Sequence, residues 1–547
     1  MTWNTANSAS PTTAAVGTES LNMPEAILSC DGVLIVARVL NDDIHVSTLP
    51  SEHDSTFKTH TLPLMDKLRR EFVGLVRCIT LSHDASLLGL KDVSNTISRI
   101  AVLKLMLASN SRLLVLQLQL PVHACEVSVK VDILLDIEFP ESHGNISVIN
   151  FVFSDESVLV MFEIAPQAIL LSLSQAQRND VPNRKISSAR GYALRHSHAT
   201  NDASSALALL TRDRHSDVVV VLEHGIVVAS FKADTVDAQG LKWSPDGTPV
   251  LAIWDSSAYG TKVKFVSALG HPLHMLDIGP LACIPARLQE DFFGTGVSAV
   301  DWVKKAGTRA TTLFAMGNGS MQILFRSQDS KSMATRSCTF QHPSTLDNSK
   351  TTIWQHLGHD SYRPVVGRWD LGNISTGEVE IVAISSDSQK VASKMQGNSN
   401  IALIWQQDKA DPIAAIIFQQ DIRQLSWDSA SSVLAITTAD SSPSVHFWSI
   451  VDQAPRQIKL PRLKSFTSKR WQGRWIARHT DGHVAPSPLF VMSNKAHFDI
   501  VRLSDLESLS VDSVFVDSRS VSDESLLDLQ SSIKSSTRGG DGSSIFF

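Results

Sequence analysis

The chain has 547 residues, of which 43% are hydrophobic and 19% are charged, and its formal net charge is −6. This is too much apolar material for a disordered chain, and the weak acidic balance disfavours nucleic acid as the main partner. The five cysteines are widely separated and form no CxxC pair, which argues against a disulfide framework or a zinc site. No apolar run reaches the ~20 residues of a membrane span, so we expect a soluble protein of the cytoplasm.

The two ends of the chain differ in composition from the rest. Residues 1–22 are polar and rich in small side chains, and we expect them to be disordered. Residues 504–547 form a Ser-rich acidic tail that is expected to be mobile. Residues 524–533 of this tail are either a short amphipathic helix that docks on a partner or part of a solvated acidic segment.

Residues 23–503 repeat one module: an apolar strand, a tight turn containing Asp with Ser or Gly, a second apolar strand, a polar loop and a third strand. Asp and Gly suit these turns because both tolerate the backbone conformations that hairpins need. The turns lie at residues 29–32, 82–85, 154–157, 244–247 and 386–388.

Several strands of this module are apolar on both faces, as in residues 218–222 and 226–229, or 157–162 and 168–173. Such strands normally belong to a sheet that is covered on both sides. Amphipathic helical patterns are nearly absent, so other sheets must provide the cover. Small sheets stacked radially in this way form a β-propeller.

The repeat is clearest after residue 240, where ten of the eleven tryptophans lie. Successive units are spaced by about 40 to 60 residues, near the ~40–45 of a WD40 repeat plus insertions. We expect the tryptophans to pack between neighbouring blades. The residues of this repeat signature are Trp243, Pro245, Asp246, Gly247, Trp254, Asp255, Trp302, Trp405, Trp427 and Trp448.

The predicted fold is an all-β, WD40-type β-propeller, with one ring of seven to nine four-stranded blades. Nine units are counted, beginning near residues 25, 72, 131, 190, 238, 296, 376, 421 and 465. Either the ring has nine blades, or one or two of these units are not true blades. Residues 340–375 contain few clean strands and are predicted to be a long insertion loop. In many propellers the N-terminal segment supplies the final strand of the last blade; if this ring closes in that way, residues 25–35 complete the blade near residues 465–503.

Nothing in the sequence predicts catalysis, a cofactor or a metal site. It contains no GxSxG elbow, no Walker-type glycine loop and no HExxH motif. The closest histidine pairs are expected in surface loops, and no further metal ligands can be assigned to them. These pairs are His196 with His198, His271 with His274, and His356 with His359. The aspartates of the repeat, such as Asp255 and Asp428, are expected to make structural hydrogen bonds.

One basic stretch, residues 459–474, stands out in this acidic chain. It is either a solvated connector between two blades or a patch that binds an acidic partner surface, tubulin tails or nucleic acid. The residues of the candidate patch are Lys464, Lys469, Arg470, Trp471 and Arg474.

Residues 241–255, with the SPDG turn followed by LAIWD, resemble the best-kept stretch of the WD-repeat protein 8 family of centrosomes and spindle pole bodies. Similar agreement returns at residues 297–302, 400–405 and 422–427. The match is dense from about 238 to 325 and from 380 to 450. The chain departs from the family at Gln406, where Asp is usual, and its N-terminal third matches only in layout.

This resemblance implies a non-catalytic, monomeric scaffold of the fungal type, located at the spindle pole body in the cytoplasmic cytoskeleton. Such a protein anchors microtubule minus ends and supports spindle assembly, with a coiled-coil anchoring protein and a kinesin-14 motor as partners. The alternatives are a translation-associated propeller similar to initiation factor 2A, or a generic WD40 adaptor. The short acidic tail disfavours the first alternative, because that factor carries a long basic extension.

Overall fold

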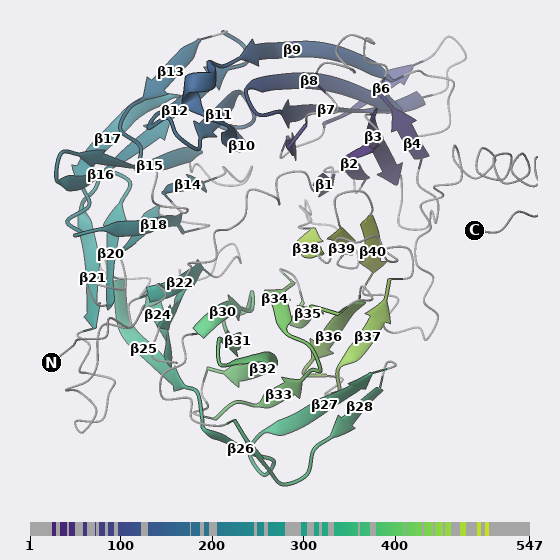
Figure 1. Ribbon diagram of the computed structural model, residues 1–547, viewed down its shortest axis with the longest axis vertical. Helices are drawn as coiled ribbons and strands as arrows, with labels where there is room; N and C mark the ends of the chain where they lie inside the picture. The colour runs from purple at the N-terminus through teal and green to yellow at the C-terminus, as the bar shows by residue number, and fades with distance from the viewer. Residues whose placement is uncertain are drawn as a thin grey trace, which may run out of the picture.

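The computed structural model describes most of the chain between residues 25 and 502 (Figure 1). The described residues are 25–28, 33–40, 43–49, 58–62, 72, 76–82, 86–91, 97–121, 129–175, 177–185, 191–195, 205–244, 249–255, 261–278, 297–302, 311–316, 320–326, 333–358, 361–371, 379–407, 409, 411–428, 431–440, 444–451, 454–460, 471–476, 489–493 and 498–502. The expected disordered N-terminus and acidic tail lie outside them.

The described residues fold almost entirely into strands. Nine sheets of three or more strands follow one another along the chain. A single 3-10 turn, η3 (Glu141–His143), is the only helical element in the part of the chain that the structure describes. Consequently, no described helix is long and apolar enough to cross a membrane.

The first five sheets lie between residues 25 and 278. They contain β1 (Glu25–Leu28), β2 (Leu34–Leu40), β3 (Asp43–Leu49) and β4 (Lys58–Thr61); β5 (Cys78–Leu81), β6 (Ser86–Lys91), β7 (Ile97–Ala108), β8 (Arg112–Pro121) and β9 (Lys130–Glu138); β10 (Ile146–Val152), β11 (Ser157–Phe162), β12 (Ala168–Ser172) and β13 (Arg178–Val181); β14 (Tyr192–Arg195), β15 (Ala206–Asp213), β16 (Ser216–Glu223) and β17 (Ile226–Lys232); and β18 (Ala238–Trp243), β19 (Val250–Asp255), β20 (Thr261–Ser267) and β21 (Pro272–Ile278).

The remaining sheets lie between residues 297 and 502. They contain β22 (Val297–Trp302), β23 (Thr311–Met316), β24 (Ser320–Arg326) and β25 (Met333–Gln341); β27 (Thr352–Gly358), β28 (Ser361–Pro364), β30 (Val379–Ile384), β31 (Lys390–Met395), β32 (Asn398–Gln406) and β33 (Ala414–Ile417); β34 (Ile422–Trp427), β35 (Val433–Thr438), β36 (Ser444–Ser449) and β37 (Arg456–Lys459); and β38 (Gln472–Ile476), β39 (Leu489–Ser493) and β40 (Phe498–Arg502). A two-stranded sheet pairs β26 (Thr345–Asp347) with β29 (Arg368–Asp370).

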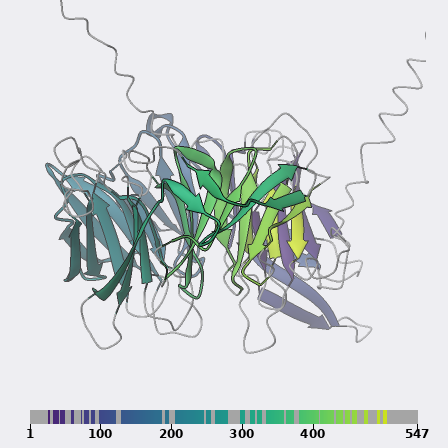
Figure 2. The same ribbon diagram turned by 90° about the horizontal axis from the view of Figure 1, so that it is seen from below.

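The sheets are arranged in one ring, and strands such as β1, β10, β14, β18, β22, β30, β34 and β38 lie nearest the centre (Figure 1). Seen from below, most strands run roughly along the short axis of the molecule (Figure 2). The core lies between the sheets, because each of nine hydrophobic clusters joins residues of two neighbouring sheets. This arrangement confirms the predicted all-β, WD40-type propeller.

Six of the nine sheets are antiparallel meanders of four strands, as predicted. The other three differ. The second sheet has five strands because the long β7 pairs with β5 along one half and with β6 along the other. The seventh sheet has six strands, and the ninth has three among the described residues.

The predicted start of the third unit, near residue 131, is wrong. Strand β9 at this position is the last strand of the second sheet, where it pairs with β8. The third sheet instead begins with β10 at Ile146. The alternating sequence of β9, KVDILLDIE, is equally suited to a first or a last strand, so periodicity alone could not place the boundary.

The segment at residues 340–375 is also different from the predicted loop. It contains β26, β27, β28 and β29, and β27 pairs in parallel with β33, the fourth strand of the seventh sheet from the centre. These strands are short and contain polar residues, so they lack the apolar pattern by which strands were predicted. The insertion therefore extends a blade instead of projecting from it.

Among the described residues, the ring closes by packing, and no strand is exchanged between the first and last sheets. One expected route of closure had residues 25–35 completing the last blade, but β1 pairs with β2 in the first sheet. The first and ninth sheets share a cluster in which Leu34 and Val36 contact Val491 and Ile500. In addition, Arg474 Nη2 of β38 donates a hydrogen bond of 2.7 Å to the Ala26 carbonyl oxygen.

Gly240 shows how tightly adjacent strands pack. It lies opposite Trp254 in the β18–β19 pair, and a Cβ at this position would lie 2.1 Å from the Trp254 ring. Trp254 is 3% exposed and packs against the sixth sheet, so displacing its ring would disturb that interface. We therefore expect Gly240→Ala to reduce the free energy of unfolding by about 1–3 kcal/mol, measured by denaturant titration. Gly397→Ala is the control, because no atom lies within 4 Å of its Cβ position; an equal loss in both variants would contradict this prediction.

Candidate functional site

The structure places the tryptophans of the repeat signature between sheets, where none is more than 8% exposed. Trp243 lies between the fourth and fifth sheets, and Trp405 lies between the sixth and seventh. These indole side chains therefore hold neighbouring sheets together and are not available to a partner. The other four are Trp254 and Trp302 between the fifth and sixth sheets, and Trp427 and Trp448 between the seventh and eighth.

The polar residues of the signature are partly outside the described residues, since Pro245, Asp246 and Gly247 are not among them. Asp255 is buried, and its carboxylate accepts hydrogen bonds from the backbone N–H groups of Val236 at 2.9 Å and Asp237 at 2.7 Å. These are structural hydrogen bonds of the kind expected from the sequence.

The basic stretch gives a mixed result. Lys464, Lys469 and Arg470 lie outside the described residues. Trp471 is only 7% exposed and packs between the eighth and ninth sheets, so its ring is not presented to a partner. Arg474 binds the Ala26 carbonyl oxygen and closes the ring. A partner-binding role therefore stays a prediction only for Lys464, Lys469 and Arg470.

A groove between the third and fourth sheets is the candidate functional site. It has a volume of about 510 Å³ and lies where β13 faces β16 and β17, at the upper left of Figure 1. Toward the centre of the ring, the same two sheets are joined by a cluster that contains Val181, Leu209 and Leu222. Toward the outside the two sheets leave the groove between them.

The apolar wall of the groove comes from the outer half of the fourth sheet. Val218 and Val220 line it from β16, and Val227 lines it from β17. The hairpin turn between these strands has positive φ at both central residues, His224 and Gly225. Such a turn matches the twist of the strands that it joins. The hairpin therefore presents an apolar surface at the rim of the ring.

This exposure corrects the expectation that both faces of the hairpin are buried. Strand β16 alternates between buried and half-buried residues, but most of β17 is exposed. Ile226 is 69% exposed, Val227 is 53% exposed and Val228 is 39% exposed. The sequence pattern was interpreted as a covered strand, whereas β17 is the uncovered last strand of its sheet.

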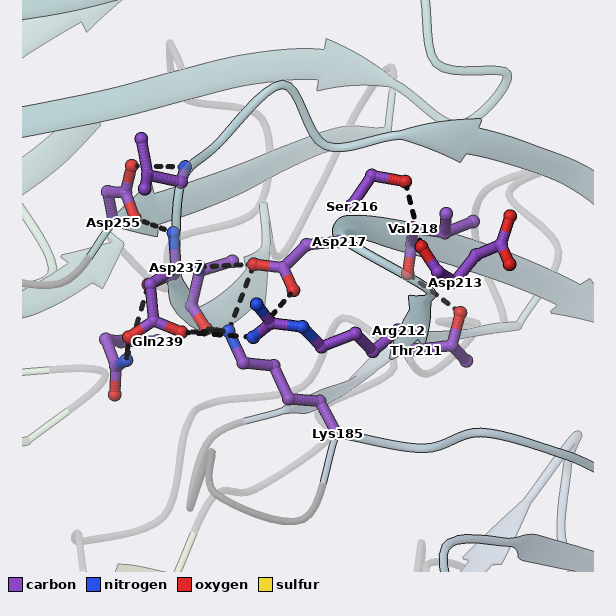
Figure 3. Close-up of polar contacts among 12 residues, drawn as sticks. Lys185, Thr211, Arg212, Asp213, Ser216, Asp217, Val218, Asp237, Gln239 and Asp255 are labelled. Atoms are coloured by element: carbon purple, nitrogen blue, oxygen red, sulfur yellow. Dashed lines mark hydrogen bonds and ion pairs between the residues drawn. The ribbon is translucent and has the colours of Figure 1, made fainter.

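The polar end of the groove is formed by a network of charged residues (Figure 3). Arg212 lines the groove and is 44% exposed. Its guanidinium lies 3.8 Å from the Asp217 carboxylate and 3.6 Å from the Asp237 carboxylate. Asp213 also lines the groove, and its backbone carbonyl accepts a hydrogen bond from Ser216.

Behind Arg212, a buried lysine joins three sheets. Lys185 follows β13, and its ammonium donates to Asp217 Oδ2 at 3.0 Å, Asp237 Oδ1 at 2.6 Å and the Ala238 carbonyl oxygen at 2.8 Å. Asp217 Oδ2 also accepts the Ala238 backbone N–H at 2.6 Å. The network therefore fixes the polar end of the groove to the fourth and fifth sheets.

This arrangement is suited to binding and offers no assembled catalytic group. The lysine is held by three acceptors, and the carboxylates around it are engaged in structural contacts. Among the described residues, no group of three His, Cys, Asp or Glu side chains could hold a metal ion. What the groove offers to a ligand is apolar surface, an open strand edge and a few charges.

Sequence reasoning did not identify Lys185, Arg212 or Asp237 as members of one site. They are separated by up to 52 residues and meet only because three sheets stack side by side. It also placed His356 in a surface loop. The residue is 6% exposed on β27, and its ring packs against His446 and Phe418. The sequence held one signal for the groove: residues 226–229 form an uncharged run at the position of the fourth strand of a unit.

Comparison with known proteins supports the WD-repeat class. No family model matches the chain. WD repeat-containing protein WRAP73 of Mus musculus is 26% identical over 272 residues, which cover 43% of this chain. The match spans about half of that relative, 53% of its length. This partial match agrees with the WD40-type propeller fold seen in the structure.

Several solved structures also resemble the chain at low sequence identity. The C-terminal WD40 domain of Sif2 is 10% identical, with a TM-score of 0.34, and the match covers 76% of this chain and 95% of that domain. Saccharomyces cerevisiae Sqt1 is 7% identical, with a TM-score of 0.41 and coverage of 72% and 90%. A eukaryotic initiation factor is 10% identical, with a TM-score of 0.42 and coverage of 80% and 88%. None of these likenesses distinguishes between functions.

Proposed function

We propose that this chain is a non-catalytic WD-repeat scaffold of the spindle pole body, and that it anchors microtubule minus ends through protein–protein binding. The observation that carries the proposal is the resemblance of residues 238–325 and 380–450 to the WD-repeat protein 8 family. The partial match to a mouse WD repeat-containing protein supports the coarser part of it, a WD40 adaptor.

The structure is consistent with a binding role. A ring of nine sheets held together by nine apolar interfaces is a rigid body with a wide rim. Its open groove offers a contact surface, while the tryptophans of the repeat are used for packing. The proposed partners are a coiled-coil anchoring protein and a kinesin-14 motor.

The test is localisation of the protein, expressed with a fluorescent tag from its own promoter. We expect one or two perinuclear foci that coincide with γ-tubulin, and co-purification of a kinesin-14 with the tagged chain. The free fluorescent tag is the control. A diffuse signal together with co-sedimentation of the chain with ribosomes would overturn the proposal in favour of the translation-associated alternative.

A further inference from the structure

We propose that the outer edge of β17 binds an extended peptide of a partner protein by strand addition, with alternate side chains of that peptide entering the adjoining groove. This inference deepens the scaffold function proposed above and rests on its protein-binding part. Strand β17 ends its sheet, and none of the described strands pairs with its outer side. Its outward N–H and C=O groups are therefore open to another strand.

The composition of β17 differs from that of three other outer strands of the ring, β4, β13 and β37. Natural proteins protect exposed strand edges with charged residues. Strands β4 (KTHT), β13 (RNDV) and β37 (RQIK) each begin with a cation and follow this rule. Strand β17 (IVVASFK) carries no charge until Lys232, its last residue. An uncharged edge with apolar side chains favours pairing with a partner strand.

Another uncharged strand of this chain, β33, pairs on its outer side with an added strand. Strand β33 (AAII) is the fourth strand of the seventh sheet and is also uncharged. There the insertion supplies β27, which pairs in parallel with β33 from Thr352 opposite Ala414 to Gln355 opposite Ile417. All four residues of β33 are buried as a result. This internal example identifies the occupant expected at β17 as an extended segment.

The register of the sheet shows which residues would meet the peptide. Ser230 lies opposite Val220, and Lys232 lies opposite Val218, so these residues share the groove-facing side of the sheet. Val227 lines the groove from the same strand. A strand added beside β17 continues this face, and every second peptide side chain points into the groove. Apolar side chains at those positions would cover Val227.

The charges of the groove are nearly balanced. Its lining contains Arg212 and Lys232 together with Asp180 and Asp213. Asp180 forms a bidentate ion pair with Arg178, at 2.7 and 2.9 Å. Binding should therefore depend on backbone pairing and apolar contact and change little with salt, in contrast to binding by a basic patch.

The experiment uses the full chain as bait and a phage-displayed library of random 12-residue peptides as the probe. Selected peptides are expected to carry apolar residues at alternate positions and to slow amide hydrogen exchange in residues 226–232. They should bind the Val227→Asp variant at least about ten-fold more weakly, because a charge would be buried beside the added strand. Val451→Asp is the matched control, since Val451 is 85% exposed, and should leave binding unchanged.

Three outcomes would overturn the inference: no peptide is selected, selected peptides bind Val227→Asp as tightly as the wild type, or the wild type sediments as a dimer that Val227→Asp dissociates. The last would make a second copy of the chain the occupant. An equal thermal unfolding midpoint shows that the variant is folded, and Ile226→Lys, at a residue 69% exposed, is a second test of the same edge. Peptide binding without foci at the spindle pole would refute only the localisation, and foci without peptide binding would refute only the strand-addition site.

Discussion

Replacing Lys185 with Met is expected to lower the free energy of unfolding by about 3–5 kcal/mol, the range for removing one partner of a buried ion pair. The side chain of Lys185 is 2% exposed and that of Asp217 is 0% exposed. Without the ammonium, the Asp217 carboxylate retains the Ala238 N–H but loses the nearest positive charge in the interior. Denaturant titration of the purified variant measures the loss.

Two further variants show whether this loss comes from the buried charge. Arg212→Met removes a guanidinium that is 44% exposed and no closer than 3.6 Å to its carboxylates, so it should cost less than about 1 kcal/mol. The double variant Lys185→Met, Asp217→Asn removes both charges and should be more stable than Lys185→Met alone. If Lys185→Met and Arg212→Met are equally destabilised, the lysine does not compensate the buried carboxylate.

The repeated features of the fold could be predicted from the sequence, because each repeat satisfies the same local rules. Hairpin turns and strands apolar on both faces indicated stacked small sheets, and nine sheets are present. The burial of Trp405 and Trp427 follows from the same pattern. Where a unit departs from the average, as at β9 or in the insertion at β27, pairing depends on distant strands that the local sequence does not specify.

The candidate site was less predictable for two physical reasons. First, a strand that is apolar on both faces has the same sequence whether it is covered or at an open edge, so the exposure of Val227 could not be foreseen. Second, Lys185 meets Asp217 and Asp237 across sheet boundaries, and no spacing rule connects such residues. The sequence pointed to the basic stretch, where Trp471 proved to be a packing residue.

A buried histidine is expected to make the protein less stable as the pH falls. Burial is the main cause that lowers the pKa of His446 from 6.5 to about 3, and the neighbouring His356 contributes to the same shift. Its Nδ1 forms a hydrogen bond of 2.5 Å with the Tyr362 hydroxyl, and this bond links the insertion strand β28 to the eighth sheet. The neutral ring is thus part of the contact that holds the insertion in place.

The sign of the effect follows from the two pKa values. Below about pH 6.5 the unfolded chain binds a proton at His446 and the folded chain does not, so stability falls as the pH is lowered toward 3. Between pH 7 and 4.5 this contributes a loss of about 2–3 kcal/mol. Burial raises the pKa of Asp387, but hydrogen bonds from Ser385, Gln389 and Ser432 outweigh it and lower this pKa to about 2. The carboxylate therefore loses its stabilising effect only below about pH 4. The window from pH 7 to 4.5 therefore excludes its contribution.

Denaturant titrations of the wild type and of His446→Phe at pH 7 and 4.5 test this prediction. The variant loses the Tyr362 hydrogen bond and should be less stable at pH 7, but its stability should fall less between the two pH values, by about 2–3 kcal/mol. His271→Phe is the control, because this histidine is exposed and its replacement should leave the pH dependence unchanged. Hydrogen exchange should show the loss at low pH first in β27 and β28, since the insertion depends on the neutral ring. An equal pH dependence in His446→Phe and the wild type would mean that the buried histidine is not the group that titrates.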